Sequence, residues 1–413
     1  MPVNVSPSVD RFTGELPDGA QWIAEVPNQW NGTLLLYGRG YSPSKTGPDS
    51  APKESRQLLL NKGYALVASA YPSVGWAVED AVPSQLLALQ AFQQRYGQAN
   101  RVIAWGKSMG GLISTALAEQ ADTDIDGVLT MCASSAGVLP MMNAALDGAF
   151  ALTTLLNVEP PVAITGAGNN FAGTEQAVEA MNAARTTTAG KARVVLAGVL
   201  GALPVWSQSD TSQPAADDYK TQEQEIAAAV ARGLFLPRGD QEFRAGGVFS
   251  WNTGVDYRAL LAASHRQPLV EYLYAEAGLD LQSDLDRLNA AARIAADQNA
   301  VDYMDRNFTP SALVTVPVLS LHTLGDGMTS PSLQQAYISQ VARVTGPEMI
   351  RGLWVARAGH CTQSAEEMLA ALIILENKLS AGVWQIDLDT LNAENTNTKF
   401  VPANVPDLPR NNL

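Results

Sequence analysis

The sequence predicts an α/β fold with a mostly parallel, twisted sheet flanked by helices and a mainly helical cap inserted between the sixth and seventh core strands. Three observations lead to this prediction. Short apolar strands alternate with helical segments over residues 10–140, which is the pattern of a parallel sheet covered on both faces. An Ala-rich, largely helical stretch interrupts the alternation from about residue 140 to 310. The alternation then resumes at residue 317.

The first part of the predicted core opens with a hairpin, because two strand-like runs flank the turn signal Pro17-Asp18-Gly19. The expected strands are Arg11–Leu16, Ala20–Val26, Thr33–Tyr37, Tyr64–Ala70, Arg101–Trp105 and Gly127–Met131. The expected helices are Lys53–Asn61, Glu79–Tyr96 and a helix from Met109 to about Gln120. Gly97 follows the second of these helices, where glycine is the usual terminating residue.

The second part of the core is expected to add two strands and two helices. In chain order these are the strand Pro317–Thr323, a helix around Ser332–Val341, the strand Met349–Ala356 and the helix Ser364–Lys378. Ser364 and Glu367 have the spacing of a capping box, which supports the start of the last helix. The chain therefore divides into core residues 1–139, a cap at 140–310, core residues 311–391 and a loosely ordered Asn/Pro-rich tail at 392–413.

The composition of the 413 residues excludes several classes of function. With 46% hydrophobic and 16% charged residues, the chain is typical of globular proteins and not of disordered ones. The formal charge of −14 repels phosphate backbones, so nucleic acid is not an expected partner. No uninterrupted apolar run is long enough to span a membrane. Met1–Asp10 lacks the pattern of a signal peptide, so we expect a cytoplasmic protein or, slightly favoured by the low charge density, a secreted one whose signal is absent here.

Cysteine and histidine are scarce. The thiols are Cys132 and Cys361, and the imidazoles are His265, His322 and His360. None of them has the spacing of a zinc site, and no glycine-rich phosphate loop is present, so we expect neither a metal nor a nucleotide cofactor. Any chemistry that depends on histidine has three candidate residues.

The strongest single motif is Gly106-Lys107-Ser108-Met109-Gly110, a G-x-S-x-G match. It lies directly between an apolar strand and an amphipathic helix, where a serine on a sharp turn needs small residues on both sides. The helix N-terminus at this point can stabilise a developing oxyanion. The motif therefore predicts that Ser108 is a nucleophile, and the alternative is a glycine-rich turn without chemistry.

A serine nucleophile needs a base and an acid that orients the base. Asp326 follows one predicted strand and His360 follows the next, so Ser108, Asp326 and His360 come in the order nucleophile, acid, base. The remaining candidates fit less well. His322 lies inside a strand, His265 lies in the predicted cap, and neither of the other possible acids, Glu366 and Asp302, follows a sheet strand.

On these residues the core, roughly residues 10–140 and 311–380, resembles the α/β-hydrolase superfamily of serine hydrolases. The segment from His322 to Pro331 is similar to the H-G-x-x-D-x-x-V-P run of prolyl-oligopeptidase-like members and esterases, with Thr323 in place of the glycine. The resemblance also implies an oxyanion donor after the third strand, where many members read H-G-x. This chain reads Arg39-Gly40-Tyr41, and we expect the N–H groups of Tyr41 and Met109 to form the oxyanion hole.

Two further features of the sequence bear on the site. Cys361 directly follows His360, which is similar to half of the tannase and feruloyl-esterase arrangement, but Lys107 stands where the second cysteine would precede the serine. A bridge from Cys361 to Cys132 is one possibility, and two buried free thiols are the other. Arg39 and Lys107 are candidates for contact with the substrate, and a solvated Arg39 is the alternative.

The sequence thus predicts a serine hydrolase that cleaves a carboxylic ester, lactone or polyester fragment through an acyl-enzyme, with a small-molecule or oligomeric ester as substrate. A peptidase or amidase acting on short peptides is an alternative. An acyltransferase or a non-catalytic binding protein on the same fold is an alternative of a different class. The sequence does not indicate an oligomeric state.

Overall fold

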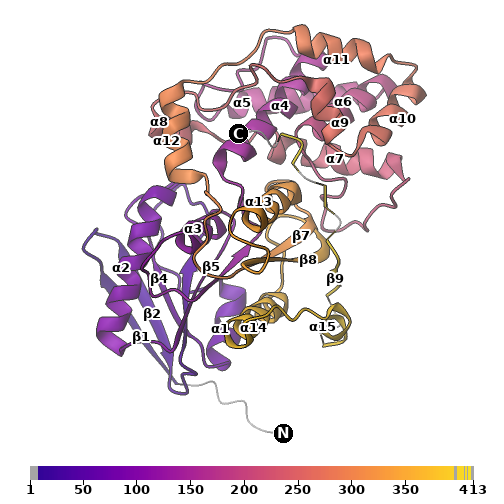
Figure 1. The fold of residues 1–413 in the computed structure, drawn as a ribbon. Coiled ribbons are helices and arrows are strands. Elements are labelled where there is room, and N and C mark those ends of the chain that lie inside the picture. The colour runs from indigo at the N-terminus through magenta and orange to yellow at the C-terminus, as the bar shows by residue number, and fades with distance from the viewer. Residues whose placement is uncertain (1–7, 395–397, 404, 407, 411–413) are drawn as a thin grey trace.

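The computed structural model describes residues 8–394, 398–403, 405–406 and 408–410, and its strands form one nine-stranded sheet (Figure 1). The strands are β1 (Val9–Glu15), β2 (Gln21–Pro27), β3 (Thr33–Gly38), β4 (Ala65–Ser69), β5 (Arg101–Lys107), β6 (Gly127–Met131), β7 (Val318–Gly325), β8 (Ile350–Ala358) and β9 (Phe400–Val401). Their spatial order is β1-β2-β4-β3-β5-β6-β7-β8-β9.

The central strands, from β4 across to β8, are parallel, whereas β1, β2 and β9 pair antiparallel at the two edges. The chain order reverses between β3 and β5, because β4 lies on one side of β3 and β5 on the other. Residues Gly38 and Gly106 stand opposite each other near the ends of these two strands. Such a reversal leaves a crevice at the carboxyl ends of the strands, where open α/β sheets bind ligands.

Helices cover both faces of the sheet. On one face pack α2 (Val78–Tyr96), α3 (Met109–Ala118) and α13 (Pro331–Val344), and on the other α1 (Lys53–Asn61) and α14 (Ala365–Ala381). Because side chains alternate along a strand, Leu34 and Leu36 of β3 join the first core, and Leu35 joins the second. Each strand and helix predicted for the core is present, and the predicted α/β fold is confirmed.

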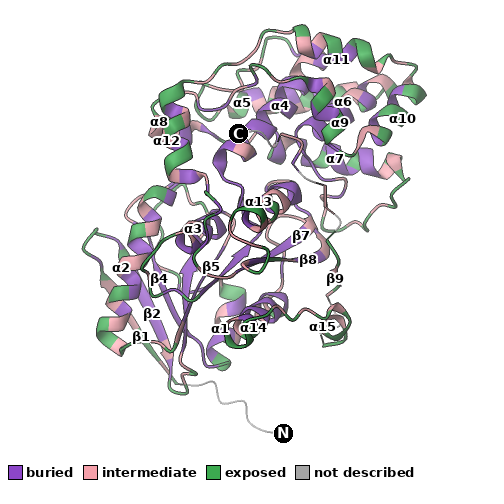
Figure 2. Cartoon of the chain, viewed as in Figure 1, coloured by how far each residue is buried: buried purple, intermediate pink, exposed green. Residues whose placement is uncertain are grey.

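A group of helices with its own apolar core lies between β6 and β7 in the chain. It comprises α4 (Val138–Leu156), α5 (Phe171–Ala184), α6 (Thr188–Leu200), α7 (Tyr219–Gly233), α8 (Gly239–Ala245), α9 (Tyr257–Ala263), α10 (Gln267–Ala277), α11 (Leu281–Ala290) and α12 (Gln298–Phe308). Among the described residues, α4 alone is long and apolar enough to cross a membrane, but 89% of its apolar window is buried inside the protein. Figure 2 shows α4 buried at the centre of this group, with exposed residues on the outer helices.

Parts of the chain end, where the sequence predicts a loosely ordered tail at 392–413, pack against the rest of the protein. The helix α15 (Leu388–Glu394) precedes β9, which pairs with β8 at the sheet edge. Phe400 and Leu408 are each only 2% exposed, and Arg410 donates a hydrogen bond to the buried Asp147 of α4 at 3.0 Å. Isolated apolar anchors in a polar segment give no periodic pattern, which is why the sequence does not reveal them.

Candidate active site

Strand β5 leads directly into Ser108, which immediately precedes helix α3. Ser108 has φ 57° and ψ −126°, a conformation that L residues rarely adopt. A Cβ atom on Gly110 would lie 1.9 Å from the carbonyl oxygen of Gly38, and one on Gly106 would lie 2.3 Å from the carbonyl oxygen of Gly110. The turn and strand β3 therefore pack backbone against backbone, and only glycine fits at these two positions.

The structure brings together the three residues that the sequence singles out. His360 Nε2 lies 3.0 Å from Ser108 Oγ, and His360 Nδ1 lies 2.8 Å from Asp326 Oδ2. Asp326 follows β7 and His360 follows β8, so two adjacent parallel strands deliver the acid and the imidazole to one edge of the sheet. One imidazole thus connects a hydroxyl with a carboxylate.

Asp326 is fully buried, and its carboxylate is hydrogen-bonded by the backbone N–H groups of Met328 at 2.9 Å and Thr329 at 3.0 Å. The hydroxyl of Thr329 lies 2.8 Å from Oδ2. Burial alone would raise the pKa of Asp326, but the charge of His360 and its hydrogen bond outweigh burial, with further lowering by His322 and the N–H of Met328, so the pKa is lowered. Asp326 is therefore ionised at neutral pH and can hold His360 in one tautomer.

The environment of His360 favours its charged form. Burial alone would lower the pKa of His360, but the adjacent Asp326 carboxylate outweighs burial and raises it, with a smaller opposing effect of Arg232. The imidazole can therefore accept a proton from a neighbouring hydroxyl and retain it as an ion pair.

Cys132, which follows β6, forms a disulfide with Cys361. Of the two possibilities that the sequence leaves open, the bridge is the one that the structure contains, and the described residues include no free cysteine. The Sγ atom of Cys361 lies 3.4 Å from His360 Nε2. The disulfide thus connects the loop that carries His360 to the strand next to the Ser108 turn.

The loop after β3 runs beside Ser108, because a Cβ atom on Gly40 would lie 3.7 Å from the Cβ of Ser108. Tyr41 is the next residue of this loop, and Met109 is the first residue of α3. The two residues predicted to supply oxyanion donors thus both adjoin the segments that meet at Ser108.

The two predicted substrate contacts have structural partners. Arg39 donates to the carbonyl oxygen of Ala70 at 3.0 and 3.3 Å and stacks on the ring of Tyr71 at 4.5 Å. The half-buried guanidinium of Arg39 thus fastens the loop after β3 to the loop after β4. Lys107 forms an ion pair with Glu54 of α1 at 2.8 Å. The substrate contacts of Arg39 and Lys107 remain predictions.

Comparison with known proteins agrees with this geometry. Residues 39–363 match the family model described as alpha/beta hydrolase fold. The chain belongs to the α/β hydrolase family. It is an enzyme of the hydrolase class, and the matched region includes all three residues that meet at Ser108.

Three known proteins illustrate what this hydrolase is similar to. The chain is 31% identical to an o-phthalyl amidase of Xanthobacter agilis, over 92% of this chain and 90% of the relative. Feruloyl esterase B from Aspergillus oryzae has a similar structure, with a TM-score of 0.51 and 16% identity over 93% of this chain and 83% of the esterase. An acylaminoacyl peptidase from Pyrococcus horikoshii, 11% identical, has a TM-score of 0.47 over 94% of this chain and 44% of the peptidase.

The other histidines and acids of the hydrolase have different surroundings. His322 is buried within β7, and its Nδ1 lies 2.8 Å from the carbonyl oxygen of Thr323. His265 is exposed, and Asp302 accepts a hydrogen bond from Gln298 within α12. Among the described residues, no group of three or more histidine, cysteine or acidic side chains is placed to hold a metal ion.

Sequence reasoning missed Thr329 and the segment between α7 and α8. A hydroxyl residue three positions after a carboxylate in a loop is a signal for hydrogen bonding to that carboxylate, and Thr329 carries it.

Residues 234–238, which we term the strap, connect α7 with α8. Before the strap, a Cβ atom on Gly233 would lie 2.4 Å from the carbonyl oxygen of Gly327, next to the acid. After it, Asp240 accepts a hydrogen bond from the backbone N–H of Trp76 at 2.6 Å.

The second of these contacts lies near the loop that carries Tyr41. Gly75, which precedes Trp76, forms an isolated β-bridge with Ser42, which follows Tyr41. The strap therefore runs from the acid loop to the neighbourhood of the loop beside Ser108.

Proposed function

We propose that the protein is a serine hydrolase that cleaves the acyl bond of a carboxylic amide or ester through a covalent acyl-enzyme. The observation that carries this proposal is the continuous contact from Ser108 Oγ through the imidazole of His360 to the buried carboxylate of Asp326. In this proposal Ser108 is the nucleophile, His360 the general base and Asp326 the group that orients and charge-stabilises the imidazole.

The proposed reaction has two halves. His360 Nε2 takes the proton of Ser108 as Oγ attacks the carbonyl carbon, and the resulting oxyanion accepts hydrogen bonds from the N–H groups of Tyr41 and Met109. Protonated His360 then gives its proton to the leaving amine or alcohol, and the bond to that group breaks. In the second half, a water molecule loses a proton to His360 and attacks the acyl carbon, which releases the acid and restores Ser108.

The choice between amide and ester rests on two different arguments. The sequence alone favours an ester, because an alkoxide leaves more readily than an amine and therefore demands less of the site. The relative named as an amidase, which aligns with 92% of this chain, favours an amide. We propose an amide as the physiological bond class, with ester cleavage as an accompanying activity of the same three residues.

The helices between β6 and β7 act, in this proposal, as a cap that binds the acyl group. Two contacts support this role, Gly233 against Gly327 and Asp240 against Trp76, because they position the strap between the acid loop and the loop near Tyr41. An apolar surface over the carboxyl ends of the strands is a common location for a substrate pocket.

A matched pair of substrates tests the bond class. The 4-nitroanilide and the 4-nitrophenyl ester of one aromatic acid share the same acyl group and differ in the bond that is cleaved. Each releases a chromophore on hydrolysis. We expect the wild type to hydrolyse both and Ser108→Ala to hydrolyse neither. Turnover of the ester with no detectable turnover of the anilide, over a panel of acyl groups, would restrict the function to ester cleavage.

A further inference from the structure

Arg238, at the end of the strap, is a buried cation with few partners. Only 3% of the surface of this residue is exposed. Nη1 donates a hydrogen bond to Ser250 Oγ at 2.8 Å, and no other described residue accepts a hydrogen bond from this guanidinium. A guanidinium has five N–H donors, so most of its capacity to bind an acceptor is unused.

The charge of Arg238 is also incompletely balanced. Burial lowers the pKa of Arg238 to about 10, against the opposing effect of Glu242, so the guanidinium remains protonated at neutral pH. Both carboxylate oxygens of Glu242 lie 3.1 Å from the backbone N–H of Gly166, and no ion pair joins Glu242 to Arg238 within the described part of the chain. A buried cation without a close anion is unfavourable, which indicates that a negative group completes the site.

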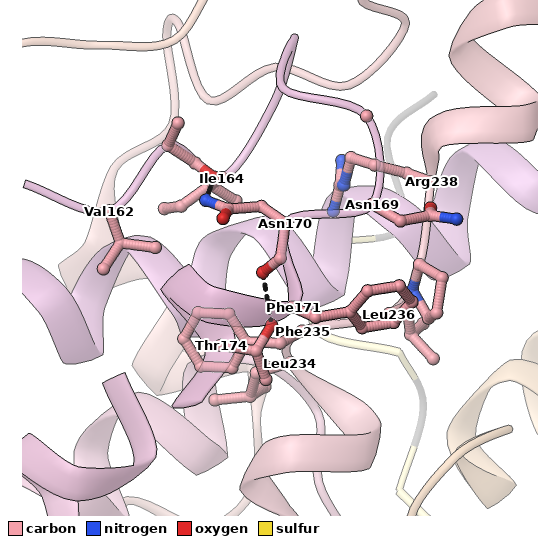
Figure 3. Close-up of a pocket in the computed structure, with 13 residues that line it drawn as sticks. Val162, Ile164, Asn169, Asn170, Phe171, Thr174, Leu234, Phe235, Leu236 and Arg238 are labelled. Atoms are coloured by element: carbon pink, nitrogen blue, oxygen red, sulfur yellow. Dashed lines mark hydrogen bonds between the residues drawn. The ribbon is translucent and has the colours of Figure 1, made fainter. Parts of the chain in front are cut away.

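Arg238 lines a cavity of about 30 Å³ between the strap and the segment that leads into α5 (Figure 3). Figure 3 shows the guanidinium of Arg238 in the upper part of the view, with the rings of Phe171 and Phe235 below it. The side chain of Asn170 is engaged elsewhere, because its amide donates to the carbonyl oxygen of Ala163 and its Oδ1 accepts from the backbone N–H of Gly173, both at 3.0 Å. Asn169 Oδ1 accepts a hydrogen bond from the backbone N–H of Gly239 at 2.8 Å, which leaves its amide NH₂ group to donate.

The size of this cavity favours a small, planar anion. Since one water molecule needs roughly 10–15 Å³ of such space, the cavity has room for about two oxygen atoms, as in a carboxylate. Tetrahedral phosphate or sulfate carries four oxygens and fits this space less well. Phe171 is 66% exposed, so an aromatic or aliphatic group attached to the carboxylate can lie against this ring outside the cavity.

We propose that Arg238, together with the amide of Asn169, forms a binding site for the carboxylate of an aromatic or aliphatic acid. Two sources would supply this group. It is either a carboxylate on the substrate of the hydrolase, held by the strap, or a separate small carboxylic acid. A bidentate contact with the guanidinium would provide charge-assisted hydrogen bonds.

Binding by the Ser108→Ala protein, which excludes turnover, tests the site. Benzoate and benzamide share a ring and differ in charge, and calorimetric titration compares them. We expect benzoate to bind at least about tenfold more tightly than benzamide. Arg238→Met should abolish this preference, and Arg238→Lys should retain part of it. Arg343→Met removes an exposed arginine on α13 and is the matched control, in which the preference should persist.

A second measurement does not depend on how the variants fold. Crystals of the Ser108→Ala protein soaked with 4-bromobenzoate should give an anomalous bromine peak beside Arg238 and Phe171. A peak found only near residue 108, or a benzoate preference that survives in folded Arg238→Met protein, would overturn the proposal.

Kinetics distinguish the two sources, and this arm rests on the proposed function. A 4-nitrophenyl monoester of an aromatic dicarboxylic acid is compared with 4-nitrophenyl benzoate in the wild type and Arg238→Met. If the site holds a substrate carboxylate, Arg238→Met should raise KM about tenfold or more for the charged ester and leave KM for 4-nitrophenyl benzoate unchanged. Unchanged KM values, together with benzoate binding at Arg238, assign the site to a separate carboxylic acid. Because the titration needs no turnover, it supports or overturns the site even if the proposed function fails.

Discussion

Reduction of the Cys132–Cys361 disulfide should destabilise the protein by an amount that follows from its position in the chain. The two cysteines are 229 residues apart. Closing a loop of this length removes about 18 cal/mol/K of entropy from the unfolded chain, so the bridge stabilises the fold by about 5 kcal/mol at 25 °C in the chain-entropy model. Because Cys361 also adjoins His360, loss of the bridge should loosen the imidazole.

Urea unfolding followed by tryptophan fluorescence, with and without reductant, measures this contribution. We expect the reduced protein to unfold at markedly lower urea, and kcat/KM of the reduced but folded protein to fall about ten- to a hundredfold, since small displacements of a catalytic group are costly. The Cys132→Ser, Cys361→Ser double variant should match the reduced wild type. Its stability and activity should not change when reductant is added. Equal unfolding curves and equal activity in the oxidised and reduced proteins would refute this reasoning.

Three further predictions concern the turn, the acid and the tail. Gly110→Ala should abolish activity and lower stability by several kcal/mol, because its Cβ would lie 1.9 Å from the carbonyl oxygen of Gly38; Gly40→Ala, whose Cβ meets only ordinary contacts, should fold with an unchanged denaturation midpoint. Asp326→Asn should lower kcat about 10⁴-fold. The Asp326 carboxylate raises the pKa of His360, and kcat/KM requires His360 to be neutral. Wild-type activity should therefore be lost as pH falls through that pKa. The residual activity of Asp326→Asn, which lacks the carboxylate, should persist to lower pH. Arg410→Met should cost about 3–5 kcal/mol at neutral pH, measured by urea unfolding, because it removes the ion-pair partner of the buried Asp147 carboxylate. Burial raises the pKa of Asp147 from 3.8 to about 6 in spite of Arg410. Between these two pH values the carboxyl group is protonated more fully in the folded state than in the unfolded state. Asp147 should therefore reduce wild-type stability as pH rises from about 4 to about 6.

Sequence reasoning succeeded for the core because the determining interactions are local. Leu34, Leu35 and Leu36 read as one apolar strand because both faces of β3 are buried, and Gly97 marks the end of α2. The order of Ser108, Asp326 and His360 along the chain also predicted their meeting, because parallel strands deliver their carboxyl ends to one edge of the sheet.

The features that the sequence did not reveal depend on contacts between distant segments. Thr329 was visible as a residue of the acid loop, but its bond to Asp326 depends on the fold of that loop. Arg238 reads as an ordinary charged residue, and its burial arises only when the strap packs beside the segment before α5. Arg410 lies in a polar tail, and its partner Asp147 is on α4. Such pairs leave no periodic signal in either segment.

The central claim is that Ser108 attacks a carbonyl carbon with the help of His360 and Asp326, and a covalent probe tests it most directly. Wild type, Ser108→Ala and His360→Ala are treated with a fluorophosphonate, and the adduct is located by peptide mass spectrometry. The account predicts stoichiometric labelling of Ser108 in the wild type, strongly slowed labelling in His360→Ala and no labelling at residue 108 in Ser108→Ala. Labelling of another residue, or hydrolysis of the substrate panel by Ser108→Ala at the wild-type rate, would contradict it.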